Sequence, residues 1–329
     1  MYENQKDKSI QRLTIKMDRG YIYLNKNNYL HNIEVLKNLS RKELCLVVKA
    51  NAYGHGLEWA VKNAKESGIK WFAVASVGEG IQVKTVYGES RVLLLAEPSK
   101  NQLENVKAND IDLTVYNASF IDTLIKTGDE YSVHLKIDTG MHRLGCPPEK
   151  FHDLYKKIVD SNLNLIGICT HFPLADTDET ETKKSIELFE KTISDIDLSN
   201  MLLHVDNSAS SLYKLDNSFN MARVGIAAYG VQITAVENEN KLIPTMEIKT
   251  RVSNLQVRKK GEAVSYGKAQ RLSRDSIIAT APIGYGDGYP WNSFPDGKVI
   301  VNNQFCNLIG RVTICLLYTS PSPRDRLKS

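Results

Sequence analysis

Short apolar segments rich in Val, Ile and Leu recur between Leu44 and Ile226, and amphipathic segments separate them. Continuously apolar segments of this length are typical of buried parallel strands. In the intervening segments, such as Leu57–Glu66 and Thr180–Ser194, apolar residues return every three or four positions, which predicts helices. The expected strands are Leu44–Ala50, Trp71–Ser76, Arg91–Glu97, Asp110–Tyr116, Tyr131–Thr139, Leu163–Pro173, Met201–Ser208 and Met221–Ile226.

Eight strands that alternate with helices predict an α/β fold, and eight is the number that closes a (β/α)8 barrel. An open, doubly wound sheet is the structural alternative. From about Ile243 the long helical patterns stop, and Met246–Val257, Asp275–Ala281 and Lys298–Leu308 have strand patterns between Gly, Pro and Asn turns. We therefore expect a barrel domain over residues 1–241 and a mostly β domain over residues 242–314.

The last residues, Cys315–Ser329, leave the strand pattern for a Ser/Pro/Arg-rich segment without periodicity. We interpret Cys315–Asp325 as the translation of a transposon-end sequencing adapter, so that residues 315–329 are not native. A natural disordered tail is the alternative, and the nucleotide sequence would decide. If the interpretation holds, the β domain is incomplete, and we expect the chain to be unstable or poorly active.

Composition and charge narrow the classes of function. The chain has 329 residues, of which 42% are hydrophobic, and a formal net charge of +4 without a Lys/Arg cluster among aromatics. So small a charge predicts neither a nucleic-acid partner nor a membrane surface. Five widely spaced cysteines without a C-x-x-C pair argue against a disulfide framework or structural zinc. The polar N-terminus lacks the apolar core of a signal peptide, so we expect a cytoplasmic protein.

Polar residues at the ends of the predicted strands are the candidates for chemistry, because barrel enzymes carry their sites there. Lys49 ends the apolar segment LCLVVKA and precedes a glycine-rich turn. A lysine that loses hydration has a lowered pKa, and its neutral amine can form an imine. A solvated surface lysine is the alternative. Ser208 and the Gly225–Ile226 turn follow late strands, where barrels often bind phosphate, although Ser208 could also be a helix cap.

A metal-dependent barrel hydrolase is an alternative from another class of enzyme. Its ligands would be Asp138, His171, His204 and Asp206. Neither an H-x-H nor an H-E-x-x-H spacing occurs in the sequence, and a single histidine at a strand end is more often a hydrogen-bonded structural group. We therefore expect no metal.

Seven sequence blocks follow one another along the chain: VVKANAYGHG (Val47–Gly56), KIDTGMHRLG (Lys136–Gly145), THFPLAD (Thr170–Asp176), HVDNSAS (His204–Ser210), ARVGIAAYG (Ala222–Gly230), VSYG (Val264–Gly267) and PIGYGDGYP (Pro282–Pro290). Taken in order, they resemble the alanine racemase family over Arg19–Ile314. The resemblance implies a barrel followed by a β domain, a pyridoxal 5'-phosphate cofactor, and a homodimer whose sites use residues of both chains. It also implies that L- and D-alanine are interconverted by two bases, which supplies D-alanine for peptidoglycan.

The resemblance also assigns catalytic and substrate-binding residues by matching position. Lys49 resembles the imine lysine and base on one face of the substrate, and Tyr266 the base on the other face, acting in the partner's site. Arg143 resembles the ligand of the substrate carboxylate, and Lys136, often carbamylated in the family, steadies it. Two further positions lie near the substrate: Tyr285 resembles a substrate-entry residue and Ile314 a pocket residue.

Cofactor contacts follow in the same way. Arg223 resembles the partner of the pyridine nitrogen, and His171 the histidine that links this arginine to the tyrosine. The remaining cofactor-binding positions, most of them phosphate contacts, are Tyr53, Asn207, Ser208, Gly225 and Ile226. A serine or broad-spectrum racemase is the alternative within the class. A non-catalytic pyridoxal-phosphate-binding barrel is less compatible with the second domain and the VSYG tyrosine. The decarboxylases with this barrel use an acidic ring-nitrogen partner, which Arg223 disfavours.

Overall fold

The computed structural model describes residues 12–213, 218–233 and 242–320. The chain divides into two compact units, which are described separately below. One comprises Asn25–Thr245, and the other comprises Met1–Leu24 together with Met246–Ser329.

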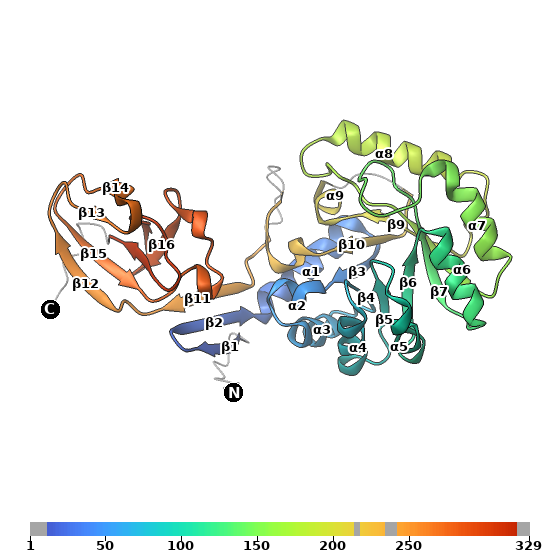
Figure 1. Ribbon diagram of the computed structural model, residues 1–329, viewed down its shortest axis with the longest axis horizontal. Helices are drawn as coiled ribbons and strands as arrows, with labels where there is room; N and C mark the ends of the chain where they lie inside the picture. The colour runs from blue at the N-terminus through green and yellow to red at the C-terminus, as the bar shows by residue number, and fades with distance from the viewer. Residues whose placement is uncertain (1–11, 214–217, 234–241, 321–329) are drawn as a thin grey trace. The chain divides into compact units, whose positions relative to one another are not determined.

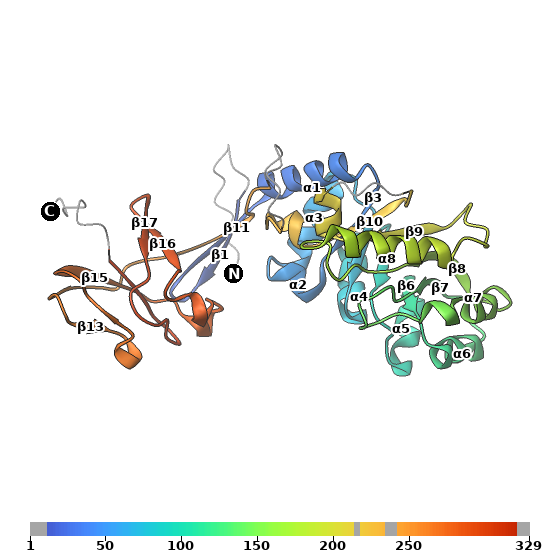
Figure 2. The ribbon, with the colours of Figure 1, turned by 90° about the horizontal axis from the view of Figure 1, so that it is seen from above.

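The first unit is a closed barrel of eight parallel strands in the order β10-β3-β4-β5-β6-β7-β8-β9 (Figures 1 and 2). The barrel closes where β10 pairs with β3, in the register Met221 with Glu43 and Arg223 with Cys45. The predicted (β/α)8 architecture is confirmed, and the open-sheet alternative is wrong. The strands are β3 Glu43–Val47, β4 Trp71–Val74, β5 Arg91–Leu94, β6 Ile111–Val115, β7 Ser132–Lys136, β8 Asn164–Cys169, β9 Leu202–Asp206 and β10 Met221–Val224.

Helices cover the outside of this barrel (Figure 1). Alternate strand residues face them, as β4 shows: Phe72 and Val74 belong to the cluster that includes the helices, whereas Trp71 and Ala73 belong to a separate interior cluster. This two-residue period is what a pleated strand requires. The helices are α1 Lys26–Ser40, α3 Leu57–Glu66, α4 Val77–Val86, α5 Leu103–Ala108, α6 Ala118–Thr127, α7 Phe151–Val159, α8 Glu179–Thr192 and α9 Ser208–Tyr213, and α2 Lys49–Tyr53 is a short turn described below.

The second unit is built from small antiparallel sheets. β12 (Asn254–Arg258), β15 (Ser276–Ala281) and β18 (Leu317–Thr319) form one sheet, and β16 (Lys298–Val301) forms a hairpin with β17 (Gln304–Asn307). A short pair, β13 (Ala263–Val264) with β14 (Gln270–Arg271), lies outside the predicted strand segments. The predicted β-rich character of the region is confirmed, but two predicted strands are each two strands. Met246–Val257 covers β11 (Met246–Thr250) and β12, and Lys298–Leu308 covers β16 and β17.

The structure departs from the expected domain boundaries at the N-terminus. β1 (Arg12–Met17) and β2 (Gly20–Asn25) form a sheet with β11 (Met246–Thr250), in which Ile22 pairs with Ile248. This segment therefore belongs to the second unit and not to the barrel, because its backbone hydrogen bonds are satisfied by β11. The predicted boundary after residue 241 borders residues 234–241, which lie outside the described part of the chain.

The segment after Ile314 also carries structure. Strand β18 pairs with β15, in the register Leu317 with Ala281 and Thr319 with Ala279, and both Leu317 and Thr319 are buried. Residues 317–319 thus share the sheet of the second unit. The adapter origin of Cys315–Asp325 stays a prediction, and residues 321–329 lie outside the described part. Within the described ranges, no helix combines the length and the apolar character that crossing a membrane requires.

Candidate active site

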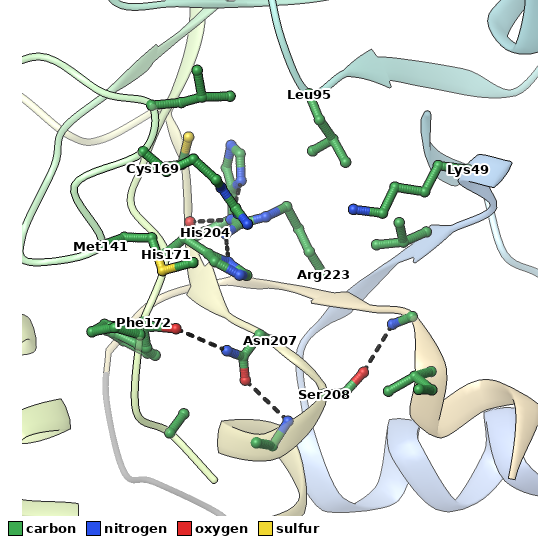
Figure 3. A pocket seen from close by; sticks show the side chains of 18 of the residues that line it. Lys49, Leu95, Met141, Cys169, His171, Phe172, His204, Asn207, Ser208 and Arg223 are labelled. Carbon is green, nitrogen blue, oxygen red and sulfur yellow. Dashed lines mark hydrogen bonds between the residues drawn. The ribbon is translucent and has the colours of Figure 1, made fainter. Parts of the chain in front are cut away.

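A cavity of about 530 Å³ lies within the barrel unit, among residues at the carboxyl ends of its strands. Lys136 is the last residue of β7, Lys49 and Ser208 follow β3 and β9 by two residues, and Gly225 directly follows β10. Every barrel residue predicted for the site lines this one cavity: Lys49, Tyr53, Lys136, Arg143, His171, Asn207, Ser208, Arg223, Gly225 and Ile226. Figure 3 shows Lys49 pointing into it, toward the side where Arg223 lies.

A left-handed turn brings Lys49 and Tyr53 to the cavity. The residues Ala50 to Tyr53 all have φ between 52° and 54°. Side chains with a Cβ disfavour this region, at about 1–2 kcal/mol for each residue. Hydrogen bonds hold the turn: Leu57 N donates to Asn51 Oδ1 (2.8 Å), and Gly56 N donates to Asn51 O (3.0 Å).

Glu79 fastens this turn to the neighbouring loop of the barrel. Its carboxylate accepts from Ala75 N at 3.0 Å and from Asn51 N at 3.4 Å. The negative charge of Glu79 also raises the pKa of Lys49, but burial and the positive charge of Arg143 outweigh it, so the pKa of Lys49 is lowered overall. A larger fraction of the Lys49 amine is therefore neutral and nucleophilic than in water.

A small cradle of hydroxyl and backbone N–H groups lies on the opposite wall. Ser208 Oγ accepts from Gly225 N at 2.9 Å and from Ala227 N at 3.4 Å. A Cβ on Gly225 would lie 2.5 Å from Tyr53 Oη, so only glycine leaves this space open. Ser208 does not cap α9, because Asn207 Oδ1 accepts from the first free N–H groups of that helix, at 3.0 and 3.1 Å. The Ser208 hydroxyl, which accepts from these N–H groups and can still donate its own proton, and the space beside Gly225 suit a phosphate group.

Arg223 is buried, and protein acceptors fix two of its three nitrogens. Nη1 donates to Nδ1 of His204 at 2.7 Å and to the His204 carbonyl oxygen. Nη2 donates to the Thr170 carbonyl oxygen at 2.6 Å and lies 3.4 Å from His171 Nδ1. A guanidinium has five N–H groups. Within the described residues, acceptors lie near the N–H groups of Nη1 and Nη2 but none lies near the Nε–H, which is available to a ligand.

The surroundings of the two histidines beside Arg223 favour their uncharged form. Burial, followed by the charge of Arg223, lowers the pKa of His171 to about 3 and that of His204 well below its ordinary value. A guanidinium cation between them opposes a metal ion at this position, and Asp206 of the hypothetical metal set pairs with Lys42 Nζ at 2.5 Å instead. No group of three or more His, Cys, Asp or Glu side chains within the described ranges is arranged to hold a metal.

The end of β7 and the loop that follows it present a further pair of cations, Lys136 and Arg143, to the cavity. Asp138 Oδ1 accepts from Gly140 N and His142 N, each at 3.0 Å, and these bonds shape the loop that carries Arg143. Burial alone would raise the pKa of Asp138, but the backbone donors lower it overall. Lys136 is 8% exposed, and burial lowers its pKa. Within the described part of the chain, no ion pair is recorded for Arg143, so its charge remains available to an anionic ligand.

Three predicted residues lie in the second unit. Tyr266 is 75% exposed and sits on a tight turn that Ser265 anchors through a 2.7 Å bond from its Oγ to Arg311 O. Tyr285 and Ile314 lie side by side, since Tyr285 N donates to Thr313 O and Gly286 N to Ile314 O, at 3.0 and 2.8 Å. The structure places these residues on their own domain, and their roles toward the barrel cavity stay predictions.

Polar residues that contact the residues of the cavity, directly or through one another, were not identified from the sequence. Glu79, Asp112 and His134 were not singled out. Asp112 and His134 interrupt the apolar strands IDLTV and SVHLK, and both are completely buried. A charged or polar residue inside an otherwise apolar strand was the available signal, because such groups are buried only with partners. Glu79 carries no comparable signal, since an acid in the first turn of a helix is ordinary.

The fold and the cavity together define the class of the protein. It is a (β/α)8 barrel in which a half-buried lysine, Lys49, faces the same cavity as the Ser208 hydroxyl. Residues 24–233 match the family described as "Alanine racemase, N-terminal domain", and residues 245–320 match "Alanine racemase, C-terminal domain". The alanine racemase of Treponema denticola is 34% identical over 314 residues, which cover 90% of this chain and 83% of that protein. The chain therefore belongs to the alanine racemase family, and with it to the isomerases.

Solved structures agree. The alanine racemase of Clostridium difficile 630 superimposes with a TM-score of 0.83 at 27% identity, over 94% of this chain and 84% of that chain. The alanine racemase of Bartonella henselae, solved with covalently bound pyridoxal phosphate, gives a TM-score of 0.83 at 24% identity, over 92% and 86% of the two chains. At that identity the second likeness shows the fold.

Proposed function

We propose that the protein is a pyridoxal 5'-phosphate-dependent alanine racemase that moves the Cα proton of alanine between the two faces of the substrate. One observation carries the proposal: a lysine with a lowered pKa, a buried arginine with one free donor, and a hydroxyl-lined cradle face the same cavity. When bound, the cofactor supplies an electron sink for the pair left at Cα as the proton departs.

The residues of the cavity fit the three functional groups of this cofactor. Lys49 would hold it covalently, and the cradle of Tyr53, Ser208 and the Gly225–Ile226 backbone would hold its phosphate. Arg223 would donate its Nε–H to the ring nitrogen. Because a guanidinium keeps its proton at accessible pH, Arg223 donates a hydrogen bond without transferring the proton. Asn207 shapes the start of α9 and so positions Ser208.

Substrate binding and proton transfer fall to other side chains. Arg143 would pair with the carboxylate of alanine, and the buried Lys136, as an amine or carbamylated, would steady it. Lys49 would hold or release a proton on one face. Tyr266 of the partner subunit would do so on the other face, and two such groups are what inversion at Cα requires.

This assignment requires a homodimer, because Tyr266 would act in the site of the partner chain. Tyr266 is exposed on its own unit, as are large apolar side chains of the same unit such as Leu255, Val257 and Phe305. Leu255 and Val257 project from the same face of β12, and exposed apolar side chains on one face favour a protein partner, for which we propose a second copy of the chain. Tyr285 and Ile314 would then border the entrance and the substrate pocket. In the cell, a cytoplasmic enzyme of this kind would supply D-alanine for peptidoglycan.

The test combines a chiral assay with cofactor trapping. The purified protein, supplied with pyridoxal phosphate, should interconvert L- and D-alanine, and serine in the same assay measures its substrate preference. After borohydride reduction, peptide mapping should find the cofactor on Lys49. Lys49→Ala should lose both trapping and turnover, whereas Lys100→Ala, an exposed lysine, should keep both. Trapping that persists in Lys49→Ala would show that another lysine is the anchor.

A further inference from the structure

Polar side chains form a row through the barrel interior beneath Arg223. Arg91 Nη2 donates to Asp112 Oδ2 at 2.7 Å, and His134 Nε2 lies 3.6 Å from the same carboxylate oxygen. His134 Nδ1 lies 2.9 Å from His204 Nε2, and His204 Nδ1 accepts from Arg223. Asp112, His134 and His204 are all completely buried. The row thus leads from the rim residue Arg91 to the guanidinium in the cavity.

A glycine keeps the central contact open. His134 and His204 lie on β7 and β9, with β8 between them. On β8, a Cβ added to Gly167 would lie 2.7 Å from His134 Nδ1, the atom that meets His204. The absence of a side chain at this position therefore lets the two imidazole rings approach each other across the intervening strand.

The protons along this row can be assigned from Arg223 alone. Arg223 only donates, so Nδ1 of His204 must be an acceptor without a proton. A neutral imidazole carries one proton, so His204 is protonated at Nε2, which donates to His134 Nδ1. His134 must then carry its own proton on Nε2, the atom that faces the Asp112 carboxylate. The opposite tautomers would place two donors against each other at Arg223.

The contacts at Asp112 and at Arg223, the two ends of the row, favour the same placement of protons on the imidazole nitrogens. Asp112 is a carboxylate paired with Arg91, and its negative charge favours a proton on the imidazole nitrogen that faces it. Within the described ranges His134 Nε2 has no hydrogen-bond partner, and the Asp112 carboxylate at 3.6 Å acts on it through its charge and not through a hydrogen bond. The hydrogen-bonded part of the row, from His134 through His204 to Arg223, restricts the orientation of the guanidinium.

We propose that His134, oriented by Asp112, is a positioning residue that fixes His204 as an acceptor and thereby holds Arg223 with its Nε–H directed at the ligand. The inference rests on the proposed function in that it takes Arg223 as the partner of the cofactor ring. His134 itself lies below the cavity and touches no ligand, and its effect on binding passes through His204.

The direct test is the nitrogen spectrum of the histidine rings in the full-length protein labelled with ¹⁵N-histidine. The chain has seven histidines, which single substitutions can assign. We expect His134 and His204 to be neutral and protonated at Nε2. A proton on Nδ1 of His204 would overturn the proposal, whether or not the protein proves to be a racemase.

Two substitutions of His134 separate positioning from simple packing. His134→Asn keeps an acceptor near the Nδ1 position, whereas His134→Leu removes it and leaves the His204 donor unsatisfied. In His134→Leu we expect the dissociation constant for pyridoxal phosphate to rise by about 5- to 150-fold, the range for a buried donor left unpaired, and in His134→Asn by less than about 3-fold. The His204 tautomer should be unchanged in His134→Asn.

The control is Val133→Ala, which removes packing from the helix-facing side of the same strand. It should lower the melting temperature without changing the cofactor affinity or the His204 tautomer. Equal cofactor affinity in the Leu and Asn variants would overturn the proposal and leave His134 as packing. If His134→Leu does not fold, the tautomers of the unsubstituted protein and of His134→Asn still decide. Failure of all these proteins to bind pyridoxal phosphate, with the predicted tautomers present, would refute the proposed function alone.

Discussion

The cavity crowds positive charge into a partly buried space. Four cations line it: Lys49, Lys136, Arg143 and Arg223. After burial, the charge of Arg143 helps to lower the pKa of Lys49, and the charges of both arginines help to lower the pKa of Lys136 and of His171. Buried cations without enough carboxylates are costly unless an anion joins them. A phosphate and a substrate carboxylate are two such anions. At the scale of single residues, this charge balance explains why an anionic cofactor and an amino acid suit the same cavity.

Arg143 gives the first prediction. Arg143→Ala should raise the KM for alanine by roughly 10- to 150-fold, because the carboxylate loses a charge-assisted hydrogen bond of about 1.5–3 kcal/mol. Cofactor trapping on Lys49 should persist. Arg143→Lys, which keeps the charge but not the planar fork, should give an intermediate KM. Steady-state kinetics with both enantiomers measure the effect, and an unchanged KM in the Ala variant would remove Arg143 from the substrate site.

His171 predicts how stability depends on pH. Its pKa is about 3 in the folded protein and 6.5 in the unfolded chain. Between these values the unfolded chain binds a proton that the folded protein does not, so stability falls as pH drops from 6.5 toward 3. His204 acts in the same direction. His171→Asn, which keeps an acceptor for Arg223, should weaken the loss of stability between pH 7 and pH 5. Urea unfolding at both pH values tests this, and an unchanged difference would contradict it.

At the residue scale the sequence identified the cavity well but not its supports. Every barrel residue that the motif blocks predicted for the site lines the cavity, whereas lining residues such as Leu95 and Thr114 lie outside these blocks. Other features depend on contacts between residues far apart in sequence. They are the unpaired Nε–H of Arg223, the tautomers of His134 and His204, and the hydrogen bonds that the Glu79 carboxylate accepts. Arg223 and His204, for example, are brought together only by pairing of β10 with β9. Such contacts exist only once the barrel has closed.

At the scale of elements, the left-handed turn after β3 is the least expected feature. Ala50, Asn51, Ala52 and Tyr53 carry positive φ although none of them is glycine. Residues held in this region store strain that their surroundings must offset. We expect Ala50→Gly, which relieves the strain at an exposed position, to raise the free energy of unfolding by about 0.5–1 kcal/mol.

Urea unfolding provides the measurement for this substitution. Ala60→Gly is the control for the sign of the effect, because Ala60 is buried within the regular helix α3, where glycine should destabilise by at least about 1 kcal/mol. The two substitutions should therefore have opposite signs. Destabilisation of similar size in both would show that the turn is not left-handed in solution.

The elements differ in how far the sequence revealed them. All eight barrel strands fall inside the predicted segments or within one residue of them, because a strand buried on both faces leaves a continuous apolar record. β1 and β2 left a weaker record: their residues are mostly half-buried, and their partner β11 lies more than two hundred positions later. The left-handed turn cannot be recognised in the sequence, since its residues are compatible with an ordinary helix.

At the scale of the whole molecule, the two proposed bases lie on different units. Lys49 lies in the barrel unit and Tyr266 in the second unit, where its side chain is 75% exposed. An exposed tyrosine on a strained turn, with Ser265 at φ 66°, is displayed outward from its own domain. This arrangement suits a tyrosine that acts in the site of a partner chain.

Complementation between two inactive chains tests that arrangement. Lys49→Ala and Tyr266→Phe homodimers should each be nearly inactive, and Tyr266→Phe should lose the roughly 10²- to 10⁴-fold that one acid–base group contributes while still binding the cofactor. In a heterodimer of the two, one site would receive Lys49 and Tyr266 intact, and the other would receive both lesions. We expect about half of the activity per dimer to return after the two proteins are unfolded and refolded together, with differently tagged chains to isolate the heterodimer. If both bases come from one chain, each site of the heterodimer lacks a base, and the purified heterodimer stays inactive.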